Sequence, residues 1–195
     1  LAFFLACELA AQATQAGLYD GGKFGAPLLV LAGIATVADI VPLTEQNRII
    51  VANALKNMRA APIGVRELFD RARRRCAETT SRDFGFVISP RINAAGRMGS
   101  AREAYDLLMA DDREESRLLA QRVDCRNAER KTVENRMIEE AVAQIPDAPS
   151  AAAFACDSAG ENLSWHSGVC GIVAARLLDR YGVPAAVAVG RCGSV

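Results

Sequence analysis

The sequence predicts an α/β protein that is mainly helical and ends in a small α/β unit with an incomplete sheet. Three observations support this prediction. Apolar residues recur at helical spacing through most of the first 110 residues, residues 111–145 form one long charged segment without a helix breaker, and the residues after Pro149 follow a strand–helix–strand pattern. Apolar residues make up 51 % of the 195 residues and charged residues 24 %, a globular composition that excludes a wholly disordered chain.

Five helices are predicted before residue 91. The second is apolar throughout and follows a glycine-rich loop at residues 17–25. Thr44 provides an N-cap for the third, Pro62 opens the fourth, and Pro90 is expected to end the fifth, because a proline disfavours helical backbone in the residue before it. The predicted ranges are 1–15, 27–38, 44–58, 65–76 and 80–90.

The second half of the chain is predicted to begin with a loop of small residues at 89–99. Ser100 and Glu103 have the spacing of a capping box, which predicts a helix as far as Met109. Further on, strands are expected at residues 151–156 and 184–189, with a helix between them at 168–181.

The long charged segment is predicted to be one helix of about 33 residues, or roughly 50 Å. Of residues 111–140, 16 are charged, and residues 124–132 are almost wholly polar. A helix that is polar on all sides usually bridges solvent between domains. A coiled-coil arm is the alternative, but no heptad pattern continues through the polar middle.

The formal net charge is zero, but the charges are unevenly distributed. Residues 59–102 contain ten arginines and four acidic residues, a local net charge of +6, and the chain as a whole has 20 arginines and only 3 lysines. Arginine suits bidentate contacts to phosphate. A solvated surface is an equally good interpretation of such a stretch on composition alone.

Six cysteines are scattered along the chain, and no two form a Cys-x-x-Cys pair. Because the chain also has only one histidine, a zinc finger is excluded. The spacing predicts reduced, mostly buried thiols, as in a cytosolic protein, and no disulfide scaffold.

Asp39 is the first candidate functional residue. It lies between two apolar runs, in the segment from Thr36 to Leu43. A carboxylate is costly to bury unless it binds a cation or a hydrogen-bond partner. A metal ligand and a helix cap are both compatible with this position.

Arg91, Asn93 and Arg97 are the second set of candidates. They lie among small residues at 89–99, which would let a ligand approach the backbone, and the two guanidinium groups would bind phosphate. A turn with solvated arginines is the alternative.

His166, the only histidine, is the third candidate. It is predicted at the start of a helix, beside Gly168 and Gly171. Free N–H groups and the positive end of the helix dipole make a helix start an anion site, which favours phosphate contact. A lone histidine with a structural role is the alternative.

In this order, and with a long charged helix between the second and the third, these segments resemble one family. They read TVADIVPL at residues 36–43, PRINAAGRM at 90–98 and WHSGVCGIVAARLLDRYGVPA at 165–185. Together they are similar to the RecJ single-stranded-DNA exonucleases of the DHH phosphoesterase superfamily. The resemblance covers nearly the whole chain.

The resemblance implies a domain organisation and an activity. Residues 1–110 would be the C-terminal part of a DHH catalytic domain, residues 111–146 a connecting helix, and residues 147–195 the N-terminal part of a truncated DHH-associated domain. RecJ-like enzymes release mononucleotides from the 5′ end of single-stranded DNA with Mn²⁺ or Mg²⁺, in DNA repair and recombination. The expected protein is a cytoplasmic, monomeric hydrolase without a membrane segment, whose partners are single-stranded DNA, a single-strand-binding protein and a helicase.

The resemblance also implies roles for the candidate residues of the first two segments. Asp39 matches the metal-binding aspartate of the family's fourth motif, as one ligand of a two-metal site. Arg91, Asn93 and Arg97 match a motif that lines the cleft, where arginine contacts substrate phosphate.

The third segment matches the Trp-His motif of the associated domain. His166 corresponds to the histidine placed near the 5′ phosphate or the scissile bond, which makes it the candidate catalytic residue as well as a DNA contact. Gly168 and Arg176 belong to the same nucleic-acid-binding segment.

The chain also departs from the family pattern. The Asp-His-His triplet and two earlier aspartate motifs are absent, so they are expected upstream of Leu1, and the chain is expected to be an internal fragment that is inactive alone. Ser167 stands where the family usually has proline. Two alternatives remain: a phosphodiesterase for short oligonucleotides or cyclic dinucleotides, and an inactive relative that serves as a replication scaffold.

Overall fold

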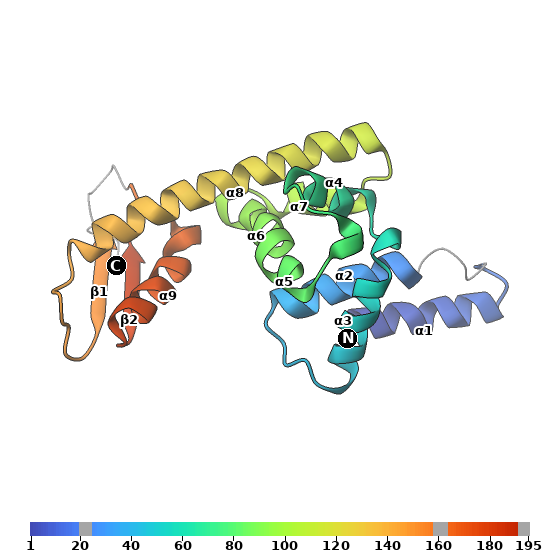
Figure 1. The fold of residues 1–195 in the computed structure, drawn as a ribbon, viewed down its shortest axis with the longest axis horizontal. Coiled ribbons are helices and arrows are strands. Elements are labelled where there is room, and N and C mark those ends of the chain that lie inside the picture. The colour runs from blue at the N-terminus through green and yellow to red at the C-terminus, as the bar shows by residue number, and fades with distance from the viewer. Residues whose placement is uncertain (20–24, 158–163, 191–195) are drawn as a thin grey trace. The chain divides into compact units, whose positions relative to one another are not determined.

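The structure is a computed structural model that describes residues 1–19, 25–157 and 164–190 (Figure 1). The described residues are mostly helical, with two strands near the C-terminal end, which confirms the predicted mainly helical α/β class. The α-helices and the strands are α1 (Ala2–Gln15), α2 (Gly25–Ala38), α3 (Glu45–Lys56), α4 (Ile63–Arg71), α5 (Ser81–Asp83), α6 (Ser89–Met98), α7 (Ala101–Met109), α8 (Arg113–Val142), β1 (Ala153–Asp157), α9 (Cys170–Tyr181) and β2 (Ala185–Val189). The short helices are η1 (Met58–Ala60), η2 (Cys76–Glu78), the π-helix η3 (Phe84–Ile88) and η4 (Ser167–Val169).

The chain divides into two compact units. The first unit comprises Leu1–Asn93 and Glu103–Asp124, and the second comprises Ala94–Arg102 and Cys125–Val195. Three helices, α6, α7 and α8, therefore contribute residues to both units.

The first unit is built around α2 and its neighbours. A Cβ atom added to Gly33 would lie 2.3 Å from the Cβ of Ala54, so α2 and α3 approach at a distance that only glycine permits. The ring of Phe84, from η3, lies 3.5 Å from the same point and is fully buried. This close packing fixes the C-terminal end of α2, where Asp39 follows.

The second unit contains the two strands, which are parallel, with Ala153 opposite Ala185 and Asp157 opposite Val189. Helix α9 lies beside them (Figure 1) and buries Val173 and Leu177 in the core of this unit. The strand–helix–strand prediction is therefore confirmed. Phe154 is on the other face of β1 and is 59 % exposed, so that face is open in the described residues.

Helix α4 ends earlier than predicted. The sequence pattern predicted a helix to Cys76, whereas α4 ends at Arg71. Arg73 adopts a positive φ of 54°, which stops the helix, and the Arg74 N–H then bonds the Phe69 carbonyl at 2.9 Å. The charged run that follows is a turn instead of a helical face.

The prediction of a loop at residues 89–99 is wrong, because α6 covers Ser89–Met98. Pro90 lies in its first turn, where a missing N–H costs nothing. The wider turn of η3 comes directly before it, and the Ser89 hydroxyl donates a hydrogen bond of 2.6 Å to the Phe84 carbonyl. The helical path thus continues through a proline that was expected to end it.

The sequence predicts that the polar middle of α8 is solvated on all sides, and this prediction is wrong, because one face of the helix is buried. Its buried residues recur at intervals of three and four, or of seven, along one face: Ser116, Ala120, Val123, Asn127, Glu134, Met137 and Ala141. This is the spacing of a heptad stripe. The sequence concealed the stripe because three of its positions are polar.

The five cysteines within the described residues are free, as expected for reduced thiols. Cys7 and Cys125 are exposed and the other three are half-buried, so the expectation of mostly buried thiols is wrong. Cys192 and residues 20–24 of the glycine-rich loop lie outside the described residues. None of the helices in the described ranges is long and apolar enough to cross a membrane.

Candidate functional site

Asp39 directly follows the last residue of α2. Its N–H still bonds the Ala35 carbonyl, at 3.0 Å, and the next residue, Ile40, has a positive φ of 55° that turns the chain away. The side chain is exposed, and within the described parts of the chain its carboxylate has no hydrogen-bond or ion-pair partner. A carboxylate at the negative end of a helix dipole is unfavourable unless a cation offsets it.

The alternative interpretation of Asp39 as a helix cap does not fit this geometry. Thr44 occupies the N-cap position of α3, five residues further on. The N–H groups that a capping carboxylate accepts lie at helix N-termini, whereas Asp39 lies at a C-terminus. The ligand role of Asp39 stays a prediction.

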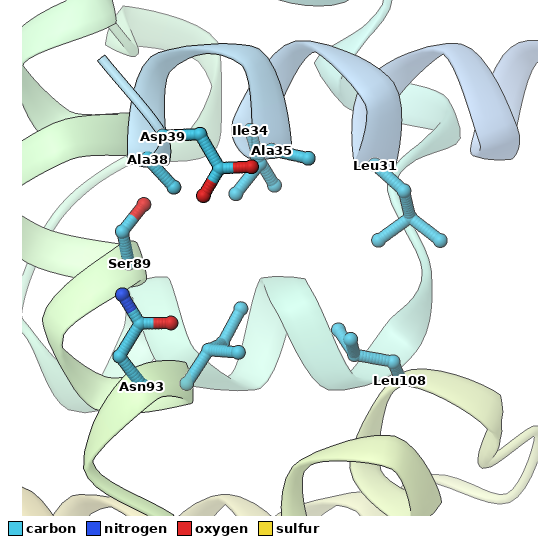
Figure 2. A pocket seen from close by; sticks show the side chains of 9 residues that line it. Leu31, Ile34, Ala35, Ala38, Asp39, Ser89, Asn93 and Leu108 are labelled. Carbon is cyan, nitrogen blue, oxygen red and sulfur yellow. The ribbon is translucent and has the colours of Figure 1, made fainter. Parts of the chain in front are cut away.

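Asp39 lines a cavity of about 280 Å³ in the first unit. Figure 2 shows its carboxylate extending from α2 toward the Ser89 hydroxyl and the Asn93 amide, which come from α6. The rest of the lining is apolar and includes Leu31 and Leu108, on the right of the view. The cavity therefore has one polar end, formed by three oxygen-bearing side chains.

The polar end fits a hard divalent cation only in part. Carboxylate, amide and hydroxyl oxygens are the ligands that Mg²⁺ and Mn²⁺ prefer. The cavity supplies one carboxylate, and the described residues contain no group of three or more His, Cys, Asp or Glu side chains that could hold a metal. Asp39 can thus be one ligand of a metal site but not the whole site.

Arg91 is engaged within the protein. Its Nε donates to the Asp124 carboxylate at 2.9 Å, and its Nη1 donates to the Val87 carbonyl at 2.7 Å. Arg71 approaches the other oxygen of Asp124 at 3.4 Å, so one carboxylate joins two arginines of the first unit. The Arg91 side chain is only 17 % exposed, which favours a structural role for most of its donors.

Arg97, His166 and Gly168 come together in the second unit. The Arg97 guanidinium donates to the Gly168 carbonyl at 3.0 Å, and the Gly168 N–H donates to Nδ1 of His166 at 3.1 Å. Both candidate side chains therefore converge on the backbone of one glycine. A Cβ atom on Gly168 would lie 2.2 Å from the Arg97 carbonyl oxygen, so this close approach requires glycine.

The hydrogen bond to His166 determines how its imidazole is presented. Because Nδ1 accepts a hydrogen bond from the Gly168 N–H, the neutral ring carries its proton on Nε2. His166 also N-caps η4, the turn that leads into α9, which confirms the prediction of a histidine at a helix start. In the described residues Nε2 has no partner, so it is able to donate to an anion.

Arg176 lies on α9 and is 61 % exposed. Its Nε is 3.4 Å from Glu134 of α8, a carboxylate that also contacts Arg130. Arg130 in turn donates to the Asn127 side chain at 3.3 Å. One buried carboxylate thus holds Arg176 at the surface with most of its guanidinium free.

The residues that hold these candidates could hardly be identified from the sequence. Asp124, Glu134 and Asp157 are partly or fully buried carboxylates, and each accepts hydrogen bonds that fix a candidate or its neighbours. Asp124 and Glu134 lie in the charged segment of α8, for which the sequence predicts solvated side chains. Asp157 had one signal, its place at the carboxyl end of a predicted strand, where ligand-positioning residues often lie.

The structure places the candidates in two groups. Asp39 and Asn93 share the cavity of the first unit, while Arg97, His166 and Gly168 form a hydrogen-bonded group in the second. Arg91 and Arg176 are each paired with a carboxylate of α8.

Comparison with known proteins gives a consistent result. No protein-family model matches the sequence. The single-stranded-DNA-specific exonuclease RecJ of Dickeya dadantii is 33 % identical over 191 residues, which is 94 % of this chain and 33 % of the relative. RecJ of Bacillus subtilis is 36 % identical over 168 residues, or 85 % of this chain and 21 % of that protein.

Solved structures show the same similarity. The crystal structure of RecJ from Thermus thermophilus in complex with Mn²⁺ superposes with a TM-score of 0.79 at 31 % identity, covering 93 % of this chain and 26 % of that one. An exonuclease RecJ bound to manganese gives a TM-score of 0.76, with 44 % of its chain covered. The present chain thus spans a third or less of the length of the curated relatives described above.

Proposed function

This chain belongs to the RecJ family over the segment that it shares with these relatives, and we propose that it is the central part of a metal-dependent exonuclease that degrades single-stranded DNA from the 5′ end. Residues 1–110 are then the end of the catalytic domain, residues 111–146 the connecting helix, and residues 147–195 the start of the associated domain. DNA repair and recombination in the cytoplasm, with a single-strand-binding protein and a helicase as partners, belong to the same proposal.

The observation that carries the proposal is the polar end of the cavity in the first unit. Asp39 presents a carboxylate there, opposite Ser89 and Asn93, that has no ion-pair or hydrogen-bond partner among the residues that the structure describes. Relatives with Mg²⁺ or Mn²⁺ bound superpose on this chain. We assign Asp39 as one cation ligand, with Asn93 as a neighbouring oxygen donor, and the remaining ligands as residues outside this chain.

A pair of divalent cations held by carboxylates would activate water and neutralise the charge of the scissile phosphodiester. The residues of this chain have other tasks. Asp39 binds one cation, and Asn93 holds its amide group at the polar end of the cavity. The apolar lining, including Leu31 and Leu108, limits the water around this polar end.

The group formed by Arg97, His166 and Gly168 binds the phosphate groups of the DNA strand. His166 donates from Nε2 to a phosphate oxygen near the scissile bond, since its Nδ1 is committed to Gly168. Arg97 uses one N–H on the Gly168 carbonyl and keeps the others for the strand. Arg176 adds a second exposed guanidinium from α9.

The aromatic side chains that could stack on nucleobases are few. Phe69, Phe84 and Trp165 are buried, whereas Phe86 is 77 % exposed and Tyr105 is 53 % exposed. Arg82 lies over the Phe86 ring, with its guanidinium carbon 5.8 Å from the ring centre. Of these five residues, Phe86 and Tyr105 are therefore the candidates for base stacking.

Digestion of end-labelled DNA by the full-length protein tests this proposal. With Mn²⁺, we expect mononucleotides to be released from the 5′ end of single strands and little attack on duplex DNA. The 195-residue chain alone is the control and is expected to be inactive, because one aspartate cannot hold two cations. Preferential cleavage of cyclic dinucleotides would contradict the proposal and favour the phosphodiesterase alternative, and DNA binding without any cleavage would favour a scaffold.

A further inference from the structure

Asp157 occupies the last position of β1 and is 8 % exposed. Its Oδ2 accepts three hydrogen bonds from the next described residues: from the Ser164 N–H at 2.6 Å, the Ser164 hydroxyl at 3.1 Å and the Trp165 N–H at 2.8 Å. A buried carboxylate that accepts several N–H and O–H bonds is strongly stabilised in its charged form. One carboxylate oxygen thus fixes the backbone of two consecutive residues.

Helix α8 holds the same two residues from a second direction. Arg136 donates to the Ser164 carbonyl, and Glu140 accepts from the indole N–H of Trp165. Trp165 is itself 5 % exposed and belongs to the core of the second unit. Backbone and side chain at residues 164–165 are therefore both constrained.

His166 is the next residue. Its imidazole accepts from Gly168, and its carbonyl accepts from the Cys170 thiol at 3.7 Å, so the local contacts are made by residues that follow it. Just before His166, the Asp157 carboxylate holds both backbone N–H groups of residues 164–165, beside the contacts that α8 makes with them. The direction in which Nε2 points therefore depends on the contacts of residues 164–165 before His166 and on the contact with Gly168 after it.

We infer that Asp157 is a positioning residue that acts through His166: it locks residues 164–165 so that the imidazole keeps Nδ1 on Gly168 and presents Nε2–H to a phosphate. This inference rests on the proposed function of His166. It assigns a task to a buried carboxylate that the metal site and the phosphate contacts do not use. A catalytic side chain must be held within about 0.5 Å of its productive position, so loss of this lock would reduce turnover.

The first test is a double-mutant cycle in the full-length protein. His166→Ala is expected to lower kcat about 100-fold. Asp157→Asn is expected to lower kcat about 10-fold with little change in KM, and to have less than about a 2-fold effect when His166 is already alanine. Equal losses in both backgrounds would show a general structural role and overturn the inference.

Asp179→Asn is the matched control, because Asp179 is an exposed residue of α9 in the same unit. It is expected to leave kcat, KM and the melting temperature unchanged. If Asp157→Asn does not fold, Ser164→Ala removes only the hydroxyl bond to Asp157, and a kcat loss of about 3-fold is expected that disappears in the His166→Ala background. No dependence on His166 in that cycle would also overturn the inference.

The second test does not need activity. His166 is the only histidine in the 195 residues, so the nitrogen NMR signals of its imidazole are unambiguous. At alkaline pH we expect a protonated Nε2 and an unprotonated Nδ1 in the wild-type chain, and a mixture of the two tautomers in Asp157→Asn. An unchanged tautomer would overturn the inference. A normal kcat in His166→Ala would instead refute the proposed role of His166, whatever the NMR result for Asp157.

Discussion

Arg97 and Gly168 are 71 residues apart in the sequence, yet the Arg97 guanidinium donates a 3.0 Å hydrogen bond to the Gly168 carbonyl. The contact is possible because Gly168 has no side chain: a Cβ atom there would lie 2.2 Å from the Arg97 carbonyl oxygen. Since the Gly168 N–H also holds His166, this one glycine couples α6 to the candidate catalytic residue.

Gly168→Ala is predicted to destabilise the chain by about 1–3 kcal/mol, because the added methyl group meets backbone that cannot move away cheaply. Gly171→Ala is the matched control. It lies one turn further on, in the first turn of α9, with nothing within 4 Å of the added methyl group. It should leave stability unchanged or raise it by up to about 1 kcal/mol. Denaturant unfolding of both variants measures the difference, and equal stabilities would contradict the described contact.

Asp39→Asn in the full-length protein is predicted to abolish cleavage while leaving DNA binding nearly unchanged, because it removes a cation ligand and no phosphate contact. Its melting temperature should be unchanged or slightly higher, since the carboxylate faces the negative end of α2 without a partner. Cleavage assays with increasing Mn²⁺, DNA-binding titrations and thermal melts give the three readouts. A clear loss of stability with normal cleavage would restore the helix-cap interpretation.

Arg91→Ala and Arg97→Ala are predicted to behave differently. Arg91→Ala should cost about 1–3 kcal/mol of stability, because it removes two hydrogen bonds of a mostly buried guanidinium, one to the Val87 carbonyl and one to the Asp124 carboxylate. Arg97→Ala should weaken binding to all single-stranded sequences alike and reduce the salt dependence of log K by about 0.7 per lost phosphate contact. Unfolding curves and binding isotherms at several salt concentrations separate the two effects. Identical behaviour of the variants would show that the two guanidinium groups share one role.

Asp83 predicts a pH dependence of stability. Hydrogen bonds from the Thr80 backbone and hydroxyl, with help from Arg74 and Arg82, lower the pKa of Asp83 below its usual 3.8 despite partial burial. Its stabilising contribution is therefore fully present above pH 3.8 and is lost as the pH falls through the lowered pKa of the folded state.

The corresponding experiment compares wild type with Asp83→Ala. The variant loses half of the capping box of α5, so it should be less stable at neutral pH by about 1 kcal/mol. This gap should close as the pH falls below 3.8, where the wild-type carboxyl becomes protonated. A gap that stays constant across that range would rule out a contribution from the ionised carboxylate.

Much of the fold could be predicted from the sequence because local signals agree with the final structure there. Helices α1, α2, α3, α7 and α9 and both strands lie close to their predicted ranges, and Thr44 occupies the N-cap position of α3, although its side chain makes no capping hydrogen bond. Helix α6 could not be predicted, because Pro90 signals an end that the π-turn of η3 avoids. Local patterns do not report such compensation.

The candidate site was only partly predictable for a different reason. Residue type and position identified Asp39 and His166 as candidates. The residues that complete each group come from distant parts of the chain: Ser89 and Asn93 for Asp39, and Arg97 for His166. Asp124 and Glu134 are charged positions in a mostly charged helix, so hydrophobic spacing could not distinguish them from solvated residues. Pairings across such separations depend on packing, which no spacing rule contains.

The exposed apolar side chains of α1 favour self-association of the chain in solution. None of the residues of this helix is buried, and Leu5 and Leu9 are 60 % and 58 % exposed. The formal net charge is zero and the isoelectric point lies near pH 6.8, so long-range repulsion between molecules is weakest around neutral pH. Near neutral pH, exposed apolar side chains therefore meet little electrostatic repulsion and favour self-association. Concentrated solutions are expected to aggregate least in buffers whose pH is well away from the isoelectric point.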